Sequence, residues 1–112
     1  MSYELLFSPM RLGSFTVKNR LVLPAVRTGL ARKDGTVTPE LIAFYQARAA
    51  GGAGLIVVEG AMVSPAGRGG VRQLAAFSDC QIPGLSRLRE EVHACGTGIF
   101  LQLTHADGRI SA

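Results

Sequence analysis

The chain has 112 residues, of which 47% are hydrophobic and 18% are charged, and its formal net charge is +4 with a pI near 9.7. This composition is typical of a globular domain, and no stretch approaches the ~18 apolar residues that a membrane-spanning helix needs. The basic side chains are scattered singly, without runs or interleaved aromatic residues, so the charge indicates a solvated surface or small anionic ligands rather than nucleic acid.

The cysteines and the N-terminus point to a cytoplasmic protein. Residues 1–10 contain Glu4 and no basic segment ahead of an apolar run, so no secretory signal is expected. Cys80 and Cys95 lack CxxC spacing, and neither His93 nor His105 lies at a zinc-finger offset from them. We therefore expect reduced thiols and no metal site.

The first predicted elements lie between residues 5 and 29. Apolar residues surround a central Gly13-Ser14 pair in segment 5–17, which predicts a β-hairpin or two extended arms. The apolar run Leu21–Leu23 predicts a buried strand that Pro24 ends. Residues 25–29 form the loop that leaves this strand, and loops of this kind often carry functional residues.

The next predicted elements are a helix and a second strand. Thr38 can cap the first helical turn, and Pro39 suits the first helical position. Apolar residues recur at offsets of three and four until Gly51, where the helix is expected to end. The β-branched run 55–58 predicts a second buried strand, closed by Glu59-Gly60.

Residues 61–77 are predicted to form a loop. Its glycine-rich part, 64–70, lacks the lysine and the GxGxxG order of phosphate-binding loops, which favours an ordinary flexible loop. Ser78-Asp79 can cap a turn, and a second helix is expected to begin at Pro83-Gly84 with His93 on its polar side. The apolar stripe of that helix consists of Leu85, Leu88, Val92 and Cys95.

Residues 98–105 predict a third buried strand, in which Gln102 interrupts the apolar run. An unpaired buried amide costs about 1–3 kcal/mol, so Gln102 is expected to have a partner. Two partners remain open. One is a heteroaromatic ligand with its own donors and acceptors, and the other is a neighbouring backbone group.

The order strand, helix, strand, helix, strand predicts an α/β fold with a parallel sheet buried on both faces and helices packed outside. Each unit takes roughly 35–45 residues, compatible with the ~30 per unit of an eight-unit barrel. Because three strands cannot close a barrel, we interpret residues 1–112 as the N-terminal part of a larger protein, without a separate second domain. A complete small open sheet is the alternative.

Several separated motifs carry a family resemblance. They are Leu6-Phe7-Ser8-Pro9, Lys18-Asn19-Arg20, Phe44-Tyr45 with Arg48, Gly51-Gly52-Ala53-Gly54-Leu55-Ile56, Ser64-Pro65 with Gly67-Arg68, Ser78-Asp79 with Ile82-Pro83, and Gln102-Leu103 with His105-Ala106. In this order they resemble the start of the old yellow enzyme family, the FMN-dependent NADH:flavin oxidoreductases. The resemblance covers essentially the whole chain.

This resemblance implies the N-terminal portion of a (β/α)8 TIM barrel, with a hairpin closing the barrel floor, about three parallel strands, two helices, and FMN at the C-terminal ends of the strands. Pro24, Ala25 and Val26 would line the flavin ring through backbone contacts. Gly60 would leave room beside the ring, and Gln102 would pair with its pyrimidine edge.

The resemblance also implies an activity for the parent protein. That protein would take hydride from NADH or NADPH and pass it through FMN to an activated alkene of the enone, enoate or dienoyl type. No residue of this chain is assigned a catalytic role, because the family's substrate-anchoring and proton-donating residues lie beyond the region that it covers. We expect the 112 residues alone to be inactive and to bind FMN weakly or not at all.

Arg27 stands where the family commonly has a smaller or less charged residue near the flavin. The segment Arg27-Thr28-Gly29-Leu30 resembles the 2,4-dienoyl-CoA reductase branch. If Arg27 faces the cofactor, its charge would stabilise negative charge there and favour an acidic substrate, so Arg27 is a candidate substrate-binding residue. If it faces solvent, nothing follows.

Two segments depart from the family pattern. Ala25-Val26 replaces a Pro-Met or Ser-Met pair, which backbone contacts would tolerate. The segment from His105 to Arg109 contains one residue more than the usual His-Ala-Gly-Arg. The geometry of the loop beyond Gln102 therefore does not follow from the resemblance.

Two further hypotheses stand beside the enzyme. The chain could be a non-catalytic barrel fragment or subunit that binds a partner chain through open sheet edges, with the rest of the barrel supplied in cis or in trans. A homo-oligomer is compatible with either arrangement. Nucleic-acid binding through the basic surplus is the weakest hypothesis, and it predicts binding that falls steeply with salt.

Overall fold

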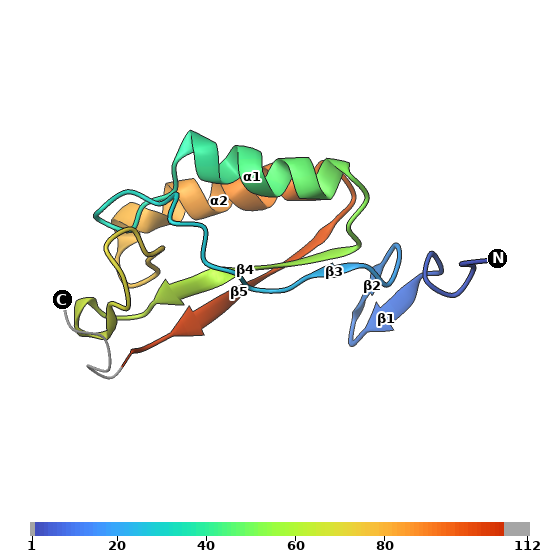
Figure 1. Ribbon diagram of the computed structural model, residues 1–112, viewed down its shortest axis with the longest axis horizontal. Helices are drawn as coiled ribbons and strands as arrows, with labels where there is room; N and C mark the ends of the chain where they lie inside the picture. Colours follow the sequence, from blue (N-terminus) through green and yellow to red (C-terminus); the bar gives the residue numbers. More distant parts are fainter. Residues whose placement is uncertain (1, 107–112) are drawn as a thin grey trace.

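The computed structural model describes residues 2–106. A hairpin of β1 (Met10–Leu12) and β2 (Phe15–Val17) precedes a parallel sheet with the strand order β3 (Val22–Leu23), β4 (Leu55–Met62), β5 (Gly98–Thr104). The helices are α1 (Pro39–Ala50) and α2 (Ile82–His93), and short 3₁₀ turns span Pro65–Gly67 and Asp79–Gln81. Both helices cover the same face of the sheet, and the hairpin lies at the end near the N-terminus (Figure 1). The predicted α/β order with parallel strands is confirmed.

Local signals fixed the hairpin and the first helix. Gly13 adopts a φ of 60° in the predicted turn, a conformation that glycine reaches without strain. At α1, the Thr38 hydroxyl accepts a hydrogen bond from the N–H of Leu41 at 3.0 Å and donates one to the carbonyl of Leu30 at 2.6 Å. Pro39 occupies the first helical position and Gly51 caps the C-terminus, as predicted.

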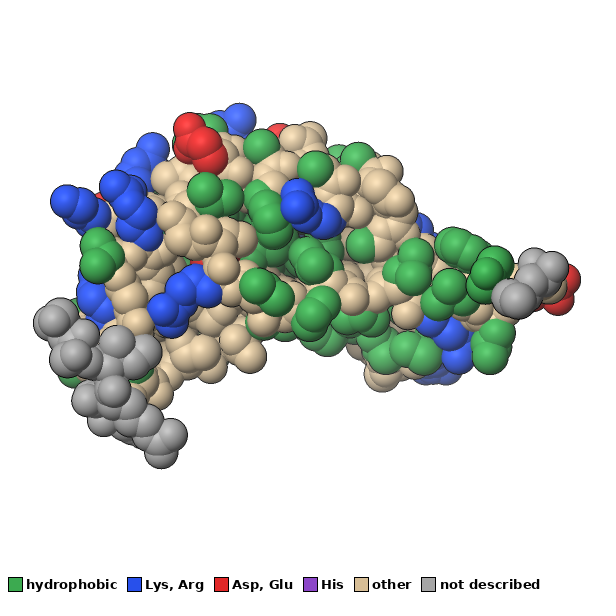
Figure 2. Space-filling model, in the orientation of Figure 1, with side chains coloured by type: hydrophobic (Ala, Val, Ile, Leu, Met, Phe, Trp, Pro, Cys, Tyr) green, Lys and Arg blue, Asp and Glu red, His purple; other side chains and the backbone are tan. Residues whose placement is uncertain are grey.

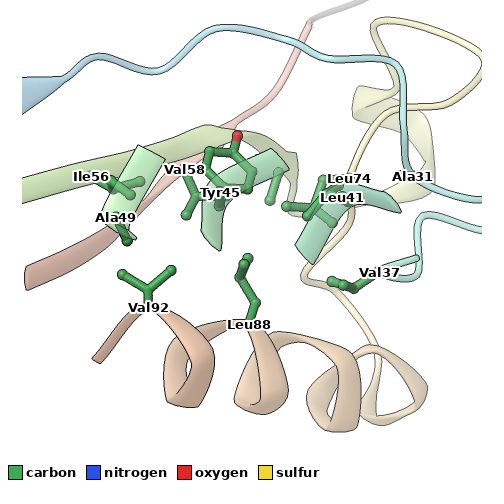
Figure 3. Packing of buried hydrophobic residues seen from close by; sticks show 11 residues of the cluster. Ala31, Val37, Leu41, Tyr45, Ala49, Ile56, Val58, Leu74, Leu88 and Val92 are labelled. Atoms are coloured by element: carbon green, nitrogen blue, oxygen red, sulfur yellow. The ribbon is translucent and has the colours of Figure 1, made fainter. Parts of the chain in front are cut away.

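The hydrophobic core lies between the sheet and the two helices. Ile56 and Val58 of β4 point toward Tyr45 of α1 and toward Leu88 and Val92 of α2, and all five side chains are buried (Figure 3). Burying each such side chain contributes roughly 1.5–3 kcal/mol, so this layer holds the helices on the sheet.

The opposite face of the sheet is open. Phe100 on β5 is 45% exposed, although it makes an edge-to-face contact with Phe15 of the hairpin at 5.6 Å. Leu103 on β5 and Val22 on β3 are also exposed. The prediction that all three strands are buried on both faces is therefore wrong for β3 and β5, because both are edge strands in residues 2–106 and no layer covers their second face.

Strand β4 is longer than predicted and contains a bulge. It does not close at Glu59-Gly60 but runs on to Met62. Its register slips between Val58, which pairs with Leu101, and Ala61, which pairs with Leu103. Two residues of β4 therefore stand opposite one residue of β5, and the extra residue reverses the alternation of faces.

The segment after β4 is more ordered than the predicted loop. Met62 bridges to Ala75 in parallel, and a 3₁₀ turn forms after Ser64. Helix α2 begins one residue before Pro83, and His93 is exposed on its surface, as predicted. Neither helix in the part of the chain that the structure describes has the length and apolarity needed to cross a membrane.

Basic side chains do not form a continuous patch on the face that Figure 2 shows, where they lie at several separate places. Apolar side chains gather on the same face toward the N-terminal end of the molecule (Figure 2). Tyr3, Leu5 and Phe7 of the N-terminal segment are all exposed. The scattered basic pattern agrees with the solvated surface expected from the sequence.

Candidate functional site

A hollow of about 260 Å³ opens where β4 and β5 end and the loop after β3 passes. Four of the six site residues predicted from the sequence meet there, namely Ala25, Arg27, Gly60 and Gln102. The other lining residues are Gly69, Gln73, Thr104, His105 and Ala106. Residues from three strand ends and one loop thus converge at the edge where parallel α/β sheets bind their ligands.

Pro24 and Val26 do not line this hollow. Both are exposed, and Val26 is 59% exposed. Of the predicted Pro24–Val26 segment, only Ala25 lines the hollow. Flavin contacts of Pro24 and Val26 stay predictions.

Gln102 is exposed rather than buried, which corrects the expectation from the sequence. It lines the hollow together with Thr104, two residues along β5, since side chains two apart share a face of a strand. Among residues 2–106 its amide makes no hydrogen bond, so the backbone partner considered from the sequence is not observed. The amide is therefore available to a ligand.

Gly60 faces Gln102 across the hollow. A Cβ atom at Gly60 would lie 2.6 Å from Cγ2 of Thr104 and 3.1 Å from Oε1 of Gln102. Any side chain at position 60 would fill the gap beside the Gln102 amide. The bulge in β4 brings Gly60 to this face, since regular alternation from Val58 would turn it toward the helices.

The side chain of Arg27 lines the hollow, which is the first of the two orientations considered from the sequence. Its Nη1 donates a hydrogen bond to the carbonyl oxygen of Gly69 at 3.0 Å. A Cβ at Gly70 would approach the same nitrogen to 2.6 Å, so the glycine-rich segment lets the guanidinium lie against it. Arg27 is the one side chain with a fixed charge among the described residues that line the hollow, and its charge is positive.

Gln73 was not singled out from the sequence, yet its amide joins three parts of the hollow. Its side chain is 2% exposed, and its Oε1 accepts a hydrogen bond from the N–H of Gly69. Its Nε2 donates to the carbonyl of Gly60 at 3.2 Å and to Oγ1 of Thr104 at 3.0 Å. The glycine-rich segment is thereby fixed to β4 and β5.

A second buried group, Glu59, was named in the sequence analysis only as the end of a strand. It is 1% exposed, and its Oε1 accepts hydrogen bonds from the Thr28 hydroxyl at 2.7 Å and from the Tyr45 hydroxyl at 3.0 Å. The backbone N–H of Thr28 donates to Oε2 at 3.3 Å. The signal for this role was an acidic residue inside an apolar, β-branched strand, since such a group needs several partners when buried.

Burial, together with the neighbouring Glu59, raises the pKa of the Tyr45 hydroxyl far above its ordinary value. The phenol therefore stays protonated and keeps its O–H to donate to Glu59.

The far rim of the hollow is formed by His105 and Ala106. The N–H of Ala106 donates to the carbonyl of Gly67 at 3.0 Å. The imidazole of His105 lies against Gly67, where a Cβ would approach Cδ2 to 2.6 Å. The rest of the loop in which one residue is inserted, including Arg109, lies outside the described residues.

Comparison with known proteins gives a consistent result. The model of the NADH:flavin oxidoreductase / NADH oxidase family matches residues 5–112. The chain is 43% identical over 102 residues to an NADH oxidase of Thermoanaerobacter brockii, covering 90% of this chain and 16% of that protein. It is 41% identical over 102 residues to an NADPH dehydrogenase of Bacillus subtilis, covering 90% of this chain and 30% of that protein.

The fold is likewise similar to that of solved structures. A 2-naphthoyl-CoA reductase in complex with 2-naphthoyl-CoA superposes with a TM-score of 0.90 at 30% identity, over 93% of this chain and 16% of that one. The hairpin, the three parallel strands and the two helices are the N-terminal portion of a (β/α)8 barrel, as predicted. The chain spans 16% and 30% of the length of the two curated relatives above.

Proposed function

The chain belongs to the NADH:flavin oxidoreductase / NADH oxidase family, and on that premise we propose that it forms one wall of the FMN site in an NAD(P)H-dependent oxidoreductase. Residues 1–112 then form part of a single barrel domain. The parent protein takes hydride from NADH or NADPH and passes it to an activated alkene.

The observation that carries this proposal is the pairing of Gly60 with Gln102 at the hollow. The Gln102 amide has its donors and its acceptor available, and it lies beside a gap that any Cβ at position 60 would fill. A flat heteroaromatic ring with alternating donors and acceptors fits both features. The residues present therefore suit the pyrimidine edge of a flavin.

Bound FMN supplies the hydride-accepting and hydride-donating chemistry that no side chain of this chain offers. The chain itself positions the ring. Gln102 would donate to and accept from the pyrimidine edge, Gly60 would leave room for the ring, and the backbone of 24–26 would line it. Hydrogen bonds from a protein amide at that edge stabilise negative charge on the ring.

The charge of the hollow supports the proposal of an acidic substrate. Arg27 presents a positive charge with no carboxylate among the described lining residues to neutralise it. A guanidinium binds carboxylates with two parallel hydrogen bonds, so an alkene that carries an acidic group is favoured over a neutral enone. One relative is an NADH oxidase and another is an NADPH dehydrogenase, so the hydride donor of this protein has to be measured.

The first experiment is the visible absorption spectrum of the protein purified from its whole natural gene, followed by release and identification of the chromophore. A flavin spectrum with FMN released in stoichiometric amount supports the proposal. Oxidation of NADH or NADPH that depends on an added 2-enoate then identifies the reaction. A colourless protein at the full mass of the gene product contradicts the proposal.

A second candidate is a non-catalytic barrel fragment that acts by binding a partner chain. The observation in its favour is the open face of the sheet, where Phe100, Leu103 and Val22 are exposed. Apolar edge strands pair readily with other chains, so the rest of a barrel in cis or in trans is the natural occupant. A natural gene product of about 11.8 kDa by mass spectrometry, eluting with a second protein and without FMN, favours this candidate.

A cytoplasmic location is part of the proposal. Cys80 and Cys95 are both free thiols, and Cys80 is exposed. Free thiols persist in reducing compartments, where NAD(P)H-linked enzymes also find their hydride donor. Fractionation of cells that express the natural gene tests this.

A further inference from the structure

The side chain of Arg27 is fixed from one direction through Gln73. Gly69 makes two hydrogen bonds here. Its carbonyl accepts one from Arg27, and its N–H donates one to the side chain of Gln73. Gln73 uses its remaining donors on the Gly60 carbonyl and the Thr104 hydroxyl. One buried amide thus fixes the acceptor of Arg27 relative to both strands that border the hollow.

The backbone of Arg27 is fixed from another direction through Glu59. Thr28, the next residue, donates both its backbone N–H and its hydroxyl to the Glu59 carboxylate. The same hydroxyl accepts the N–H of Leu30 at 3.2 Å, which closes the turn after Arg27. Glu59 is in turn oriented by Tyr45 from helix α1.

Stability alone does not account for Glu59. No lysine or arginine among residues 2–106 forms an ion pair with it, and all of its side-chain contacts are donors, an arrangement that suits a carboxylate. A buried acidic group without a counter-charge costs folding free energy. Its particular contribution is the placement of the segment that carries Arg27.

We propose that Glu59 and Gln73 are positioning residues that preorganise Arg27 to bind the acidic group of the substrate. Glu59 sets the backbone of Arg27, and Gln73 sets its guanidinium. This inference rests on the proposed function, in which Arg27 faces the substrate. It adds that the affinity for anions depends on two buried residues, Glu59 and Gln73, that hold Arg27 in place.

The test measures binding of benzoate and of its neutral analogue benzamide to the oxidised, full-length protein. Neither probe has a reducible alkene, and binding is followed by the change that it causes in the visible flavin spectrum. We expect wild-type protein to prefer benzoate. Glu59→Gln and Gln73→Ala should each weaken benzoate binding about tenfold while leaving benzamide binding within about twofold.

The decisive comparison is a double-mutant cycle with Arg27→Gln. If Glu59 and Gln73 act through Arg27, substituting them in the Arg27→Gln background causes no further loss of benzoate affinity. Hydrogen exchange of segment 24–30 should rise in Glu59→Gln while that of α2 stays unchanged. Should Glu59→Gln fail to fold, Thr28→Val removes one donor to Glu59 and serves in its place.

Gln81 provides a matched control. It is as buried as Gln73 and also makes three hydrogen bonds, to the N–H groups of Phe77 and Ser78 and to the carbonyl of Asp34, away from the hollow. Gln81→Ala should lower stability but leave the preference for benzoate intact.

The outcomes separate the two proposals. A wild-type protein that holds no FMN overturns the proposed function and this inference with it. An FMN-loaded wild-type protein that does not prefer benzoate overturns the acidic substrate and this inference, and leaves the FMN site standing. An FMN-loaded wild-type protein that prefers benzoate, combined with effects of Glu59→Gln and Gln73→Ala that simply add to that of Arg27→Gln, overturns the inference alone.

Discussion

The hydroxyl of Tyr45 and the residue Glu59 exchange two hydrogen bonds. Oη of Tyr45 donates to Oε1 of Glu59 at 3.0 Å, and the backbone N–H of Glu59 donates to Oη at 3.0 Å. The pair joins α1 to β4, and the Tyr45 ring lies in the hydrophobic core between the sheet and the helices (Figure 3).

Removing this hydroxyl should destabilise the protein. Tyr45→Phe keeps the ring packing but leaves the Glu59 N–H without its partner and takes one donor from the carboxylate. We expect a loss of about 1–3 kcal/mol in the free energy of unfolding, measured by urea denaturation of the full-length protein. Tyr3→Phe is the control, since Tyr3 is exposed and a surface change of this kind stays within about 0.5 kcal/mol. Equal effects of the two substitutions would show that the Tyr45 hydroxyl does not contribute.

The same hydroxyl predicts how stability changes at alkaline pH. Burial raises the pKa of Tyr45 above the ordinary value of about 10, so the native state keeps the proton where the unfolded chain loses it. The contribution of Tyr45 is therefore complete below about pH 10 and decreases above it. The difference in unfolding free energy between wild type and Tyr45→Phe should shrink from pH 9 to pH 11, by up to about 1.4 kcal/mol per unit above pH 10. A constant difference over this range contradicts the prediction.

Gly60→Ala should impair FMN binding through a single methyl group. The new Cβ would lie 2.6 Å from Cγ2 of Thr104, so one of the two groups must move into the hollow. We expect FMN to bind at least about tenfold more weakly, measured by fluorescence titration of the apoprotein. Adding Thr104→Ser removes the opposing methyl and keeps the hydroxyl that Gln73 contacts. This double variant relieves the contact with Thr104 but leaves the new Cβ in the gap, so FMN affinity should stay low. Full recovery would show that displacement of Thr104, rather than the Cβ itself, weakens FMN binding.

Gln102→Leu tests the amide itself. Leucine keeps the size of the side chain but cannot pair with the flavin edge, whose polar atoms would then lose their partner. We expect FMN binding to weaken about 5- to 100-fold, with little change in the unfolding of the apoprotein, because Gln102 makes no hydrogen bond within residues 2–106. Gln46→Leu is a suitable control on α1, where Gln46 contacts Glu91 on the surface. Unchanged FMN affinity in Gln102→Leu would remove the assigned role.

Short-range signals predicted most of the fold. The cap at Thr38, the glycine turn of the hairpin and the start of each strand depend on residues a few positions apart and were found near the expected positions. The end of β4 was not, because the strand runs on to Met62. The exposure of Gln102 was not predicted, because an apolar run does not show whether a neighbouring strand covers its second face.

Long-range partners limited the prediction of the site. Glu59 meets Thr28 across 31 positions of sequence, and Gln73 meets Thr104 across 31. Neither pair leaves a local pattern in the sequence. The partners of the glutamate in an apolar strand and of the glutamine in a loop could therefore not be predicted. The four residues that did converge, Ala25, Arg27, Gly60 and Gln102, follow strands or interrupt them, and a parallel sheet brings such positions to one edge.

The bulge of β4 affects the hollow without being needed for the sheet. A variant of β4 shortened by one residue between Val58 and Ala61 would pair regularly with β5 and keep the sheet continuous. The same deletion would remove either Gly60, which opens the hollow, or Glu59, which binds the Thr28 segment. The inserted residue therefore decides which face of the sheet Gly60 occupies, and transplanting the proposed site into another barrel requires moving that residue with it.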